Sequence, residues 1–477
     1  MTPVRRTKIV CTIGPSTNDF ESIVNLLLHG MNVARINCSH GTHEIHARSI
    51  NHIREAARES DYSIPVLVDL QGPKIRVGQM KDGGQILEDS SIITITGEKI
   101  EGTSSIIPID YEKLVDEAEI GNIILLDDGL LEFKVIGKNG RNLEAQVVVG
   151  GLLKSRKGVN LPNVKISIPA LTEKDIIDLE FATEQDADFV ALSFVRTADE
   201  VLDLKRRLEN LGSQAQVIAK IEKPEAIDNI DEIIEAADGI MVARGDLGIE
   251  IANEEVPVIQ KTIIQKCRVK GIPVITATQM LDSMIHNPRP TRAESSDVAN
   301  AVLDGSDAVM LSGETAAGKY PMEAVNVMDR ICRKVEERSP QLYNSLEYDK
   351  PGLLDKQIIE SIAHCCIFLA DNVGAKVIST ITHSGSTARR VAKFRPKVPI
   401  FAFTESQKIR RQLNLVWGVR SVRLDKLFDT DKSVELMKEY LKDGGQVKVG
   451  ERVVIATGIP TAKRGKTNMM TVSTIED

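Results

Sequence analysis

Two short apolar runs, 217–222 and 239–246, constrain the fold of this chain more than any other feature of its sequence. Each run is rich in Val and Ile and ends abruptly in charged residues, which is typical of a buried parallel strand. Between them, the apolar residues of 224–237 recur at helical spacing. The sequence therefore predicts a strand, a helix and a second, parallel strand.

Charged side chains stand where these two strands end. Because the strands are parallel, both sets of side chains emerge at the same edge of the sheet. Unpaired charge is costly in a structural core, so we expect a functional site in which a divalent metal lies beside a cationic group. The residues concerned are Lys220 and Glu222 from the first strand and Arg244 and Asp246 from the second.

The alternation of strand and helix extends through much of the chain and predicts eight units. Eight such units close a (β/α)8 barrel, or TIM barrel, and this is the α/β fold that we expect. Runs typical of its strands lie at 8–13, 32–36, 65–70, 188–193, 216–221, 239–243, 272–277 and 307–311.

Two further regions break the alternation. After the third strand, short alternating runs separated by Asp-Gly, Asn-Gly and Gly-Gly turns indicate a small inserted β domain, barrel-like in form. Beyond a polar stretch at 339–352, later strands and helices predict a C-terminal α/β sheet domain. The expected domains are the barrel at 1–71 and 168–340, the insertion at 72–167 and the C-terminal domain at 341–477.

Polar side chains gather at the C-terminal ends of strands two to eight. Barrel enzymes carry their active sites on this face, whereas a purely structural origin would scatter such residues. The set comprises Arg35, Asn37, Ser39, His40, Asp69, Ser193, Lys220, Glu222, Arg244, Asp246, Thr276, Thr278, Ser312 and Glu314.

Within this set, Glu222 and Asp246 are the expected metal ligands. Mg²⁺ takes one or two protein carboxylates and keeps water or substrate oxygens as its other ligands; Mn²⁺ is the alternative ion. A second interpretation stays open, in which the two carboxylates only form salt bridges with Lys220 and Arg244.

Two other motifs carry less weight. Residues 313–320 nearly match the phosphate-binding pattern GxxxxGK[ST], but Tyr320 stands where Ser or Thr must hold magnesium. His40, His43 and His46 are spaced three apart, yet His40 precedes the predicted helix and no cysteine ligand is near. A solvated helix start fits them better than a metal site.

The composition excludes several classes of function. A net charge of −8 argues against nucleic acid or an anionic membrane as the partner, and 4% aromatic residues argue against base stacking. The chain has no signal-type run, no segment of transmembrane length and no CxxC pair, so we expect a cytoplasmic protein without a zinc site or disulfides.

Longer motifs resemble those of pyruvate kinases along the whole chain, most specifically in the barrel. They are Asn37–Gly41, Lys157–Pro162, Lys220–Glu222, Met241–Glu250, Ala277–Leu281, Pro288–Glu294 and Met310–Thr315. The resemblance implies phosphoryl transfer from phosphoenolpyruvate to ADP, which gives pyruvate and ATP, within a homotetramer.

The resemblance also implies roles on the substrate side. Glu222 and Asp246 would hold the magnesium that binds the substrate, and a second magnesium would arrive with the nucleotide. Thr278 and Ser312 are candidates for relaying the proton that completes pyruvate. The substrate would contact Arg35, Lys220, Ala243, Arg244, Gly245, Asp246 and Thr278.

The same resemblance implies four nucleotide contacts and one departure from the family pattern. The contacts are Asn37, His40, Arg76 and Lys157, and the last would swing in as the inserted domain closes as a lid. The departure concerns K⁺. Many pyruvate kinases hold a monovalent cation with residues that match Asn37, Ser39 and Asp69 and with a threonine at the position of Leu70; those members carry a glutamate at the position of Lys74.

Leu70 removes that hydroxyl and Lys74 adds a tethered positive charge. A fixed ammonium and a bound K⁺ supply the same charge, and holding both would crowd like charges. We therefore expect activity without K⁺. The alternative is that Lys74 is an exposed loop lysine.

The C-terminal domain contains a candidate effector site between a strand and a helix. Hydroxyls and free amides at a helix N-terminus bind phosphate readily, so we expect a phosphorylated metabolite as an allosteric activator. A solvated basic loop without a ligand is the alternative. The residues concerned are Thr382, Ser384, Gly385, Ser386, Thr387, Lys463 and Arg464.

Two rival functions remain at this point. A metal-dependent aldolase or lyase on a related barrel would also use a Glu/Asp pair, but it needs neither the insertion nor Lys220. A non-enzymatic effector-binding protein would need the C-terminal domain but not the polar ring at the barrel mouth.

Overall fold

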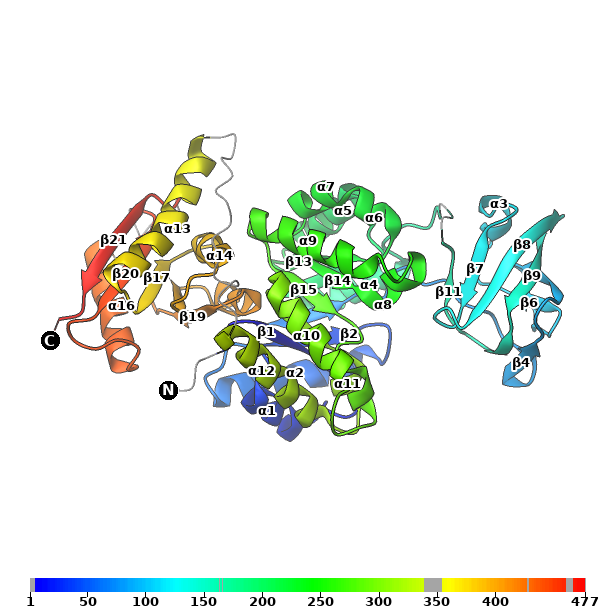
Figure 1. The fold of residues 1–477 in the computed structure, drawn as a ribbon, viewed down its shortest axis with the longest axis horizontal. Helices are drawn as coiled ribbons and strands as arrows, with labels where there is room; N and C mark the ends of the chain where they lie inside the picture. Colours follow the sequence, from blue (N-terminus) through cyan, green and yellow to red (C-terminus); the bar gives the residue numbers. More distant parts are fainter. Residues whose placement is uncertain are drawn as a thin grey trace.

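A computed structural model describes residues 5–162, 164, 166–338, 354–426, 429–459 and 466–476. Its three parts lie in a row, with the barrel between the C-terminal domain and the inserted β domain (Figure 1). Within these ranges, no helix is both long enough and apolar enough to span a membrane.

Eight parallel strands form the closed barrel that the sequence predicts. β1 pairs with β2 on one side and with β16 on the other, which closes the sheet. β13 and β14 begin and end at the predicted residues. In chain order the strands are β1 (Lys8–Ile13), β2 (Val33–Asn37), β3 (Val66–Asp69), β12 (Phe189–Leu192), β13 (Gln216–Ile221), β14 (Gly239–Ala243), β15 (Val274–Ala277) and β16 (Ala308–Leu311).

Helices cover the outside of the barrel (Figure 1). Thr172 and Asp175 form a capping box that fixes the start of one of them, α4. The helices and short helical turns of this part are α1 (Phe20–His29), α2 (His43–Glu59), α4 (Glu173–Glu184), α5 (Ala198–Asn210), α6 (Pro224–Asp228), α7 (Ile230–Ala236), α8 (Arg244–Glu250), α9 (Val256–Lys270), η2 (Asp282–Ile285), α10 (Arg292–Asp304), α11 (Gly313–Ala316) and α12 (Pro321–Arg338).

One predicted helix is broken. The pattern over 224–237 predicts a single helix, but the structure divides it into α6 and α7 at Asn229, whose φ is −99° and ψ is 16°. The side-chain amide of Asn229 donates a hydrogen bond of 2.9 Å to the carbonyl oxygen of Arg196. This contact is tertiary, so hydrophobic periodicity could not predict the break.

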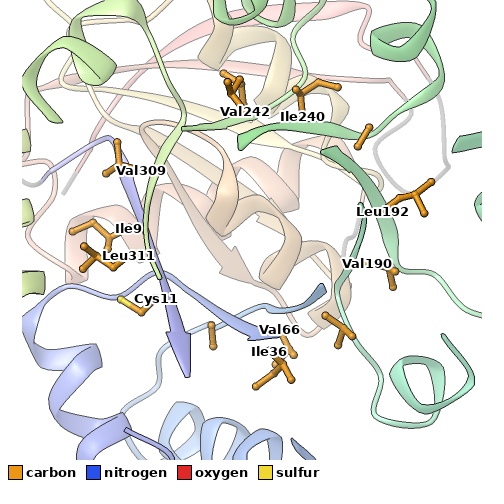
Figure 2. Packing of buried hydrophobic residues seen from close by; sticks show 14 of the residues in the cluster. Ile9, Cys11, Ile36, Val66, Val190, Leu192, Ile240, Val242, Val309 and Leu311 are labelled. Atoms are coloured by element: carbon orange, nitrogen blue, oxygen red, sulfur yellow. The ribbon is translucent and has the colours of Figure 1, made fainter. Parts of the chain in front are cut away.

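Alternate residues of the strands fill two separate layers, because side chains of a strand point in turn to opposite faces. One set points outward and packs under the helices (Figure 2). The other set, which includes Val10, Leu67, Phe189 and Met241, fills the barrel interior and is at most 2% exposed. The residues labelled in the outer layer are Ile9, Cys11, Ile36, Val66, Val190, Leu192, Ile240, Val242, Val309 and Leu311.

The insertion between β3 and β12 consists mainly of strands. A six-stranded sheet in the order β11-β7-β8-β9-β5-β6 and a two-stranded sheet of β10 and β4 enclose one hydrophobic core around Ile95 and Phe133. The elements are η1 (Lys81–Gly83), β4 (Gly84–Leu87), β5 (Ile92–Thr96), β6 (Ile106–Pro108), α3 (Leu114–Glu117), β7 (Ile123–Leu126), β8 (Leu131–Asn139), β9 (Asn142–Val149), β10 (Gly151–Lys154) and β11 (Val159–Asn160).

The C-terminal part is an α/β domain with a five-stranded sheet in the order β19-β18-β17-β20-β21, in which only β21 is antiparallel. Its elements are α13 (Leu354–Val373), β17 (Val377–Ile381), α14 (Ser386–Lys393), β18 (Ile400–Thr404), α15 (Gln407–Gln412), η4 (Leu413–Leu415), β19 (Val419–Arg423), α16 (Thr430–Asp443), β20 (Arg452–Thr457) and β21 (Met469–Thr474).

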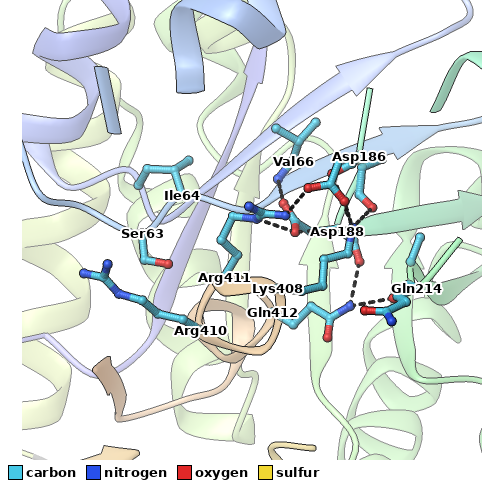
Figure 3. A network of polar contacts seen from close by, with 12 residues as sticks. Ser63, Ile64, Val66, Asp186, Asp188, Gln214, Lys408, Arg410, Arg411 and Gln412 are labelled. Atoms are coloured by element: carbon cyan, nitrogen blue, oxygen red, sulfur yellow. Dashed lines mark hydrogen bonds and ion pairs between the residues drawn. The ribbon is translucent and has the colours of Figure 1, made fainter. Parts of the chain in front are cut away.

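The C-terminal domain docks on the N-terminal end of the barrel, opposite the predicted active site. Leu415 is fully buried and belongs to the cluster that fills the barrel interior. Beside it, Arg411 Nε donates to Asp188 Oδ1 at 2.6 Å, and the other oxygen of Asp188 accepts from the backbone of Val66 at 2.9 Å (Figure 3). Lys408 Nζ contacts Asp186 Oδ1 at 2.7 Å. The domain therefore completes the barrel core.

Candidate active site

Asp69, the last residue of β3, holds two cations at the barrel mouth. Arg35 Nε and Nη2 each lie 2.7 Å from Asp69 Oδ2, and Lys220 Nζ lies 3.2 Å from Asp69 Oδ1. Asp69 is fully buried, and Arg35 and Lys220 are 8% and 9% exposed. The guanidinium of Arg35 also donates to Thr12 Oγ1 at 2.9 Å. Both cations are therefore fixed in place.

Lys220 has two further partners at the mouth. Its ammonium donates to Ser193 Oγ at 2.7 Å and lies 2.9 Å from Glu222 Oε1. Burial alone would lower the pKa of Lys220, but the Asp69 and Glu222 carboxylates outweigh burial and raise it. Burial would likewise raise the pKa of Asp69, but Lys220 and Arg35 lower it. Both groups are charged at neutral pH.

Glu222 and Asp246 fit a divalent cation electrostatically. Burial raises the pKa of Glu222, Lys220 opposes this effect, and the nearby Asp246 carboxylate raises the pKa further. A cation shared by the two carboxylates would relieve their repulsion. Across the described ranges, no group of three or more His, Cys, Asp or Glu residues could hold a metal, so an ion here would keep several non-protein ligands, as Mg²⁺ does.

The structure contains one of the two salt bridges that the alternative interpretation requires. Lys220 does pair with Glu222, but the Arg244 guanidinium lies 2.6 Å from Asp297 Oδ1 and donates to the carbonyl oxygen of Thr278 at 2.8 Å. Asp246 instead lies near Lys74, with 3.8 Å between Oδ1 and Nζ. Arg244 thus braces the loop after β15, and Asp246 stays available at the mouth.

The start of α8 and the loop after β15 meet at the mouth. The amide of Gly245 donates to Thr278 Oγ1 at 2.7 Å, and that hydroxyl donates to the carbonyl oxygen of Ala277 at 2.6 Å. Thr278 has a φ of +65°, an uncommon conformation for a β-branched residue that is found at functional sites. Ala243, at the end of β14, is the N-cap residue of α8.

Three predicted mouth residues have structural partners. Glu314 accepts hydrogen bonds from the backbone amides of Ser312 at 2.7 Å and Leu281 at 3.1 Å, and burial raises its pKa. Ser312 itself is half-buried. Thr276 was placed in the polar ring by its position, but it is fully buried and its hydroxyl bonds to Ser306 Oγ at 2.8 Å. Thr276 is therefore not at the mouth.

The expected nucleotide contacts divide between two parts of the chain. Asn37 is the last residue of β2, and its Oδ1 accepts from the amide of Ser39 at 3.1 Å; His40, three residues later, is exposed. Arg76 and Lys157 bond within the inserted domain. Arg76 Nη1 donates to the carbonyl oxygen of Arg156 at 3.1 Å, and Lys157 Nζ lies 2.7 Å from Asp127 Oδ1. The structure does not bring the two pairs together.

The sequence favours a solvated helix start for His40, His43 and His46, but in the structure His43 has two structural partners. His43 Nε2 lies 2.8 Å from Asp178 Oδ1, and its ring stacks on Phe181 with 4.3 Å between centroids.

In the candidate effector loop, Thr382 Oγ1 accepts from the amide of Gly385 at 2.8 Å, and Gly385 has a φ of +78°. Lys463 and Arg464, predicted for the same site, lie outside the described residues.

Sequence analysis missed two contributors to the site. Thr12 belongs to the first strand, the one strand to which no site residue was assigned, yet it bonds to Arg35. Phe194 donates its backbone amide to Glu222 Oε2 at 2.7 Å and has a φ of +54°. A polar residue near the end of β1 could have revealed Thr12, whereas no side-chain pattern reveals a backbone donor.

The fold and the site together define a class of enzyme. A closed (β/α)8 barrel presents buried cations and a carboxylate pair at its C-terminal mouth, which suits an anionic substrate and a divalent metal.

Comparisons with known proteins give the particular family. Residues 4–325 match the family model for the pyruvate kinase barrel domain, and residues 360–473 match that for the pyruvate kinase alpha/beta domain. Over 478 aligned residues the chain is 47% identical to a pyruvate kinase of Geobacillus stearothermophilus, with 99% of this chain and 81% of that protein covered.

Two further relatives agree. A Staphylococcus aureus pyruvate kinase is 45% identical over 476 residues, which are 99% of this chain and 81% of that protein. A crystal structure of a pyruvate kinase from Cryptosporidium parvum superposes with a TM-score of 0.92 at 37% identity, and covers 99% of this chain and 96% of that one. The chain belongs to the pyruvate kinase family.

Proposed function

We propose that this chain transfers the phosphoryl group of phosphoenolpyruvate to ADP, which yields pyruvate and ATP. The observation that carries the proposal is the Asp69 carboxylate in contact with both Arg35 and Lys220. Phosphoryl transfer depends on positioning and on charge stabilisation rather than on covalent chemistry by the protein. Two buried cations fixed by one carboxylate meet that requirement.

Arg35 and Lys220 have different tasks in this proposal. The planar guanidinium of Arg35 binds two oxygens of the substrate phosphate at once. Lys220 stabilises the phosphoryl group as it moves, and its raised pKa keeps the ammonium protonated near neutral pH. Neither task needs a large movement of the side chain, because both residues are already held.

The carboxylate of the substrate binds at the start of α8. The amides of Ala243, Arg244 and Gly245 face it together with the hydroxyl of Thr278. The bond of 2.7 Å between the Gly245 amide and Thr278 Oγ1 supports the arrangement, because it places two of these groups within reach of one ligand. Thr278 and Ser312 are the candidates to pass a proton to the enolpyruvate carbon.

Glu222 and Asp246 are the residues that would hold Mg²⁺, or Mn²⁺ in its place, and a second Mg²⁺ would be bound together with ADP. When bound, the metal supplies positive charge that polarises substrate oxygens. Glu222 is held for this task by the amide of Phe194. ADP binds at Asn37 and His40 from the barrel, with Arg76 and Lys157 from the insertion. Lys157 exchanges its bond with Asp127 for the nucleotide as the insertion closes.

Activity needs no K⁺ in this proposal. The region that holds a monovalent cation in many relatives corresponds to Asn37, Ser39, Asp69, Leu70 and Lys74. Leu70 is buried and has no hydroxyl. The ammonium of Lys74, 3.8 Å from Asp246 Oδ1, supports the proposal because it gives the mouth a fixed positive charge. For an effective dielectric constant near 20, a unit charge at 4 Å from an anion is worth about 4 kcal/mol.

Regulation and assembly complete the proposal. A phosphorylated metabolite binds the loop of Thr382, Ser384, Gly385, Ser386 and Thr387 with Lys463 and Arg464, within a homotetramer. The functional domains are 1–71 with 168–340, 72–167, and 341–477. The left-handed conformation of Gly385 supports the loop assignment, because it turns the chain into α14 and leaves amides near the helix start.

A coupled assay for pyruvate tests the proposed function. The wild-type chain should form pyruvate from phosphoenolpyruvate only when ADP and Mg²⁺ or Mn²⁺ are both present, and should form one ATP per pyruvate. An aldolase or lyase would release pyruvate from a carbon–carbon precursor without ADP. An effector-binding protein would bind phosphorylated metabolites and form no pyruvate. Either of those results would overturn the proposal.

A further inference from the structure

Both linkers between the barrel and the inserted domain contact one short barrel segment, 193–196, which follows β12. On the outgoing side, Ser193 Oγ donates to the carbonyl oxygen of Leu70 at 2.7 Å. Gly72 has a φ of +69°, and a Cβ placed on it would come within 2.8 Å of the Ser193 Cβ. The outgoing linker thus packs directly on this segment.

The returning linker is held by Arg196. Nη1 of Arg196 donates to the carbonyl oxygen of Ile166 at 2.6 Å, and Nη2 donates to that of Ile168 at 2.7 Å. Glu200 Oε1 accepts from Nε at 3.0 Å and from Nη2 at 2.6 Å, which orients the guanidinium. The planar fork of arginine can grip two carbonyls at once, whereas lysine offers a single point charge.

Ser167, which lies between Ile166 and Ile168 in the chain, is bound by side chains of the inserted domain. The amide of Ser167 donates to both carboxylate oxygens of Glu117 at 3.3 Å, and Lys113 Nζ donates to Ser167 Oγ at 3.1 Å. Glu117 and Lys113 belong to the inserted domain. Residues 166–168, which we term the strap, are therefore bound alternately by the barrel and by the insertion.

The segment that carries Arg196 also reaches the active site. The amide of Phe194 donates to Glu222 Oε2 at 2.7 Å, and Ser193 Oγ accepts from Lys220 Nζ at 2.7 Å. Four consecutive residues thus connect both linkers of the insertion to the proposed metal ligand and the proposed catalytic lysine.

We infer that Arg196 is a positioning residue that fixes the strap, so that the inserted domain closes on the barrel in one orientation. Arg196 does not touch the substrate. It acts through Ile166 and Ile168 on the insertion, which carries Arg76 and Lys157. This inference rests on the proposed function only for its kinetic consequence, because the grip on the strap is measurable without turnover.

The test compares Arg196→Met and Arg196→Lys with a matched control, Arg207→Met. Arg207 lies on α5, the helix that carries Glu200, and forms an arginine–carboxylate pair four residues apart with Asp203, at 2.8 Å, whereas it contacts none of the linker residues that the structure describes. Hydrogen–deuterium exchange of peptides that cover 160–170 reports on the strap. Steady-state kinetics give kcat and the KM of each substrate.

For Arg196→Met we expect exchange in the strap at least tenfold faster, kcat at least fivefold lower and the KM of ADP at least threefold higher. The KM of phosphoenolpyruvate should stay within twofold, because the barrel side of the site is intact. Arg196→Lys should lie between Met and wild type, since one ammonium can serve one carbonyl. Arg207→Met should match wild type in every measurement.

Unchanged strap exchange in Arg196→Met would overturn the inference, whatever the activity. The inference would also be overturned if the KM of ADP and the KM of phosphoenolpyruvate rose equally in Arg196→Met and Arg207→Met showed the same rise. If Arg196→Met does not fold, Glu117→Gln tests the strap from the insertion side and should raise the KM of ADP without changing that of phosphoenolpyruvate; no selective effect there would also overturn it. If the wild-type chain formed no pyruvate, the proposed function would be wrong. Hydrogen–deuterium exchange of the strap would then decide the inference about Arg196 by itself.

Discussion

The Asp69 carboxylate lies 3.2 Å from the ammonium of Lys220, on the oxygen that Arg35 does not use. One buried side chain therefore sets the positions of both cations at the barrel mouth. Its own charge is maintained by them, because Lys220 and Arg35 lower the pKa of Asp69 against the effect of burial. The three residues form one unit, and removal of one member should disturb the other two.

Asp69→Asn tests this unit. The change keeps the size of the side chain but removes the charge, so Arg35 and Lys220 lose their common anchor and repel each other. We expect kcat to fall by roughly 10²-fold, the size of effect that a misplacement of about 1 Å can cause. Asp178→Asn is the control, because Asp178 also pairs with two basic side chains, at 2.6 and 2.8 Å, but outside the mouth. Equal losses in the two variants would contradict the account.

Leu415→Ala tests whether the C-terminal domain completes the barrel core. Leu415 is fully buried in the interior cluster, and truncation of such a leucine typically costs about 2–5 kcal/mol. Denaturant unfolding, followed by the fluorescence of the single tryptophan, Trp417, measures the loss. Leu152→Ala, at a 51% exposed residue of the insertion, should cost far less. A similar small cost for both variants would show that Leu415 is not part of that core.

Much of the architecture could be predicted from the sequence, because buried parallel strands are continuous apolar runs that end in charge. β13 and β14 match their predicted bounds, and Lys220, Glu222 and Asp69 do lie at one mouth. What escaped prediction depends on tertiary contacts. Asn229 breaks a periodic helix because its side chain bonds to Arg196.

The partners of charged residues were equally hard to predict. Arg244 directly follows β14 and lies two residues from Asp246 in sequence, yet its guanidinium pairs with Asp297, more than fifty residues later, at 2.6 Å. The sequence around Leu415 does not indicate that this residue packs into the barrel interior, where the fold places it. Spacing along a chain identifies which face a residue occupies, but the choice among several partners depends on distances that only the fold sets.

Lys74→Glu tests the potassium proposal. The wild-type chain should be nearly fully active with Mg²⁺ in tetramethylammonium buffer, because the Lys74 ammonium supplies the positive charge near the phosphate. Lys74→Glu should lower that activity and restore a dependence on K⁺. Lys261→Glu, at an exposed lysine that pairs with Asp304, serves as the charge-matched control. Activation of the wild type by added K⁺ of tenfold or more would contradict the proposal.

The effector loop is tested by the triple change of Thr382, Ser384 and Ser386 to alanine. These hydroxyls and the adjacent amides would bind the phosphate group, so the change should abolish activation by sugar phosphates and leave basal turnover unaltered. Substrate curves with and without the phosphorylated metabolite measure the effect. If no phosphorylated metabolite shifts the curve of the wild type, the regulatory proposal is wrong.

The phosphoryl-transfer rate of Lys220→Met tests the central claim most directly. Methionine keeps the length and packing of the side chain but removes the charge, and one positioned cation is worth about 10³-fold or more in such reactions. We predict a loss of that size in kcat, with Mn²⁺ and pyruvate still bound, as followed by metal titration. Turnover within tenfold of wild type would remove Lys220 from the mechanism and contradict the account of the site.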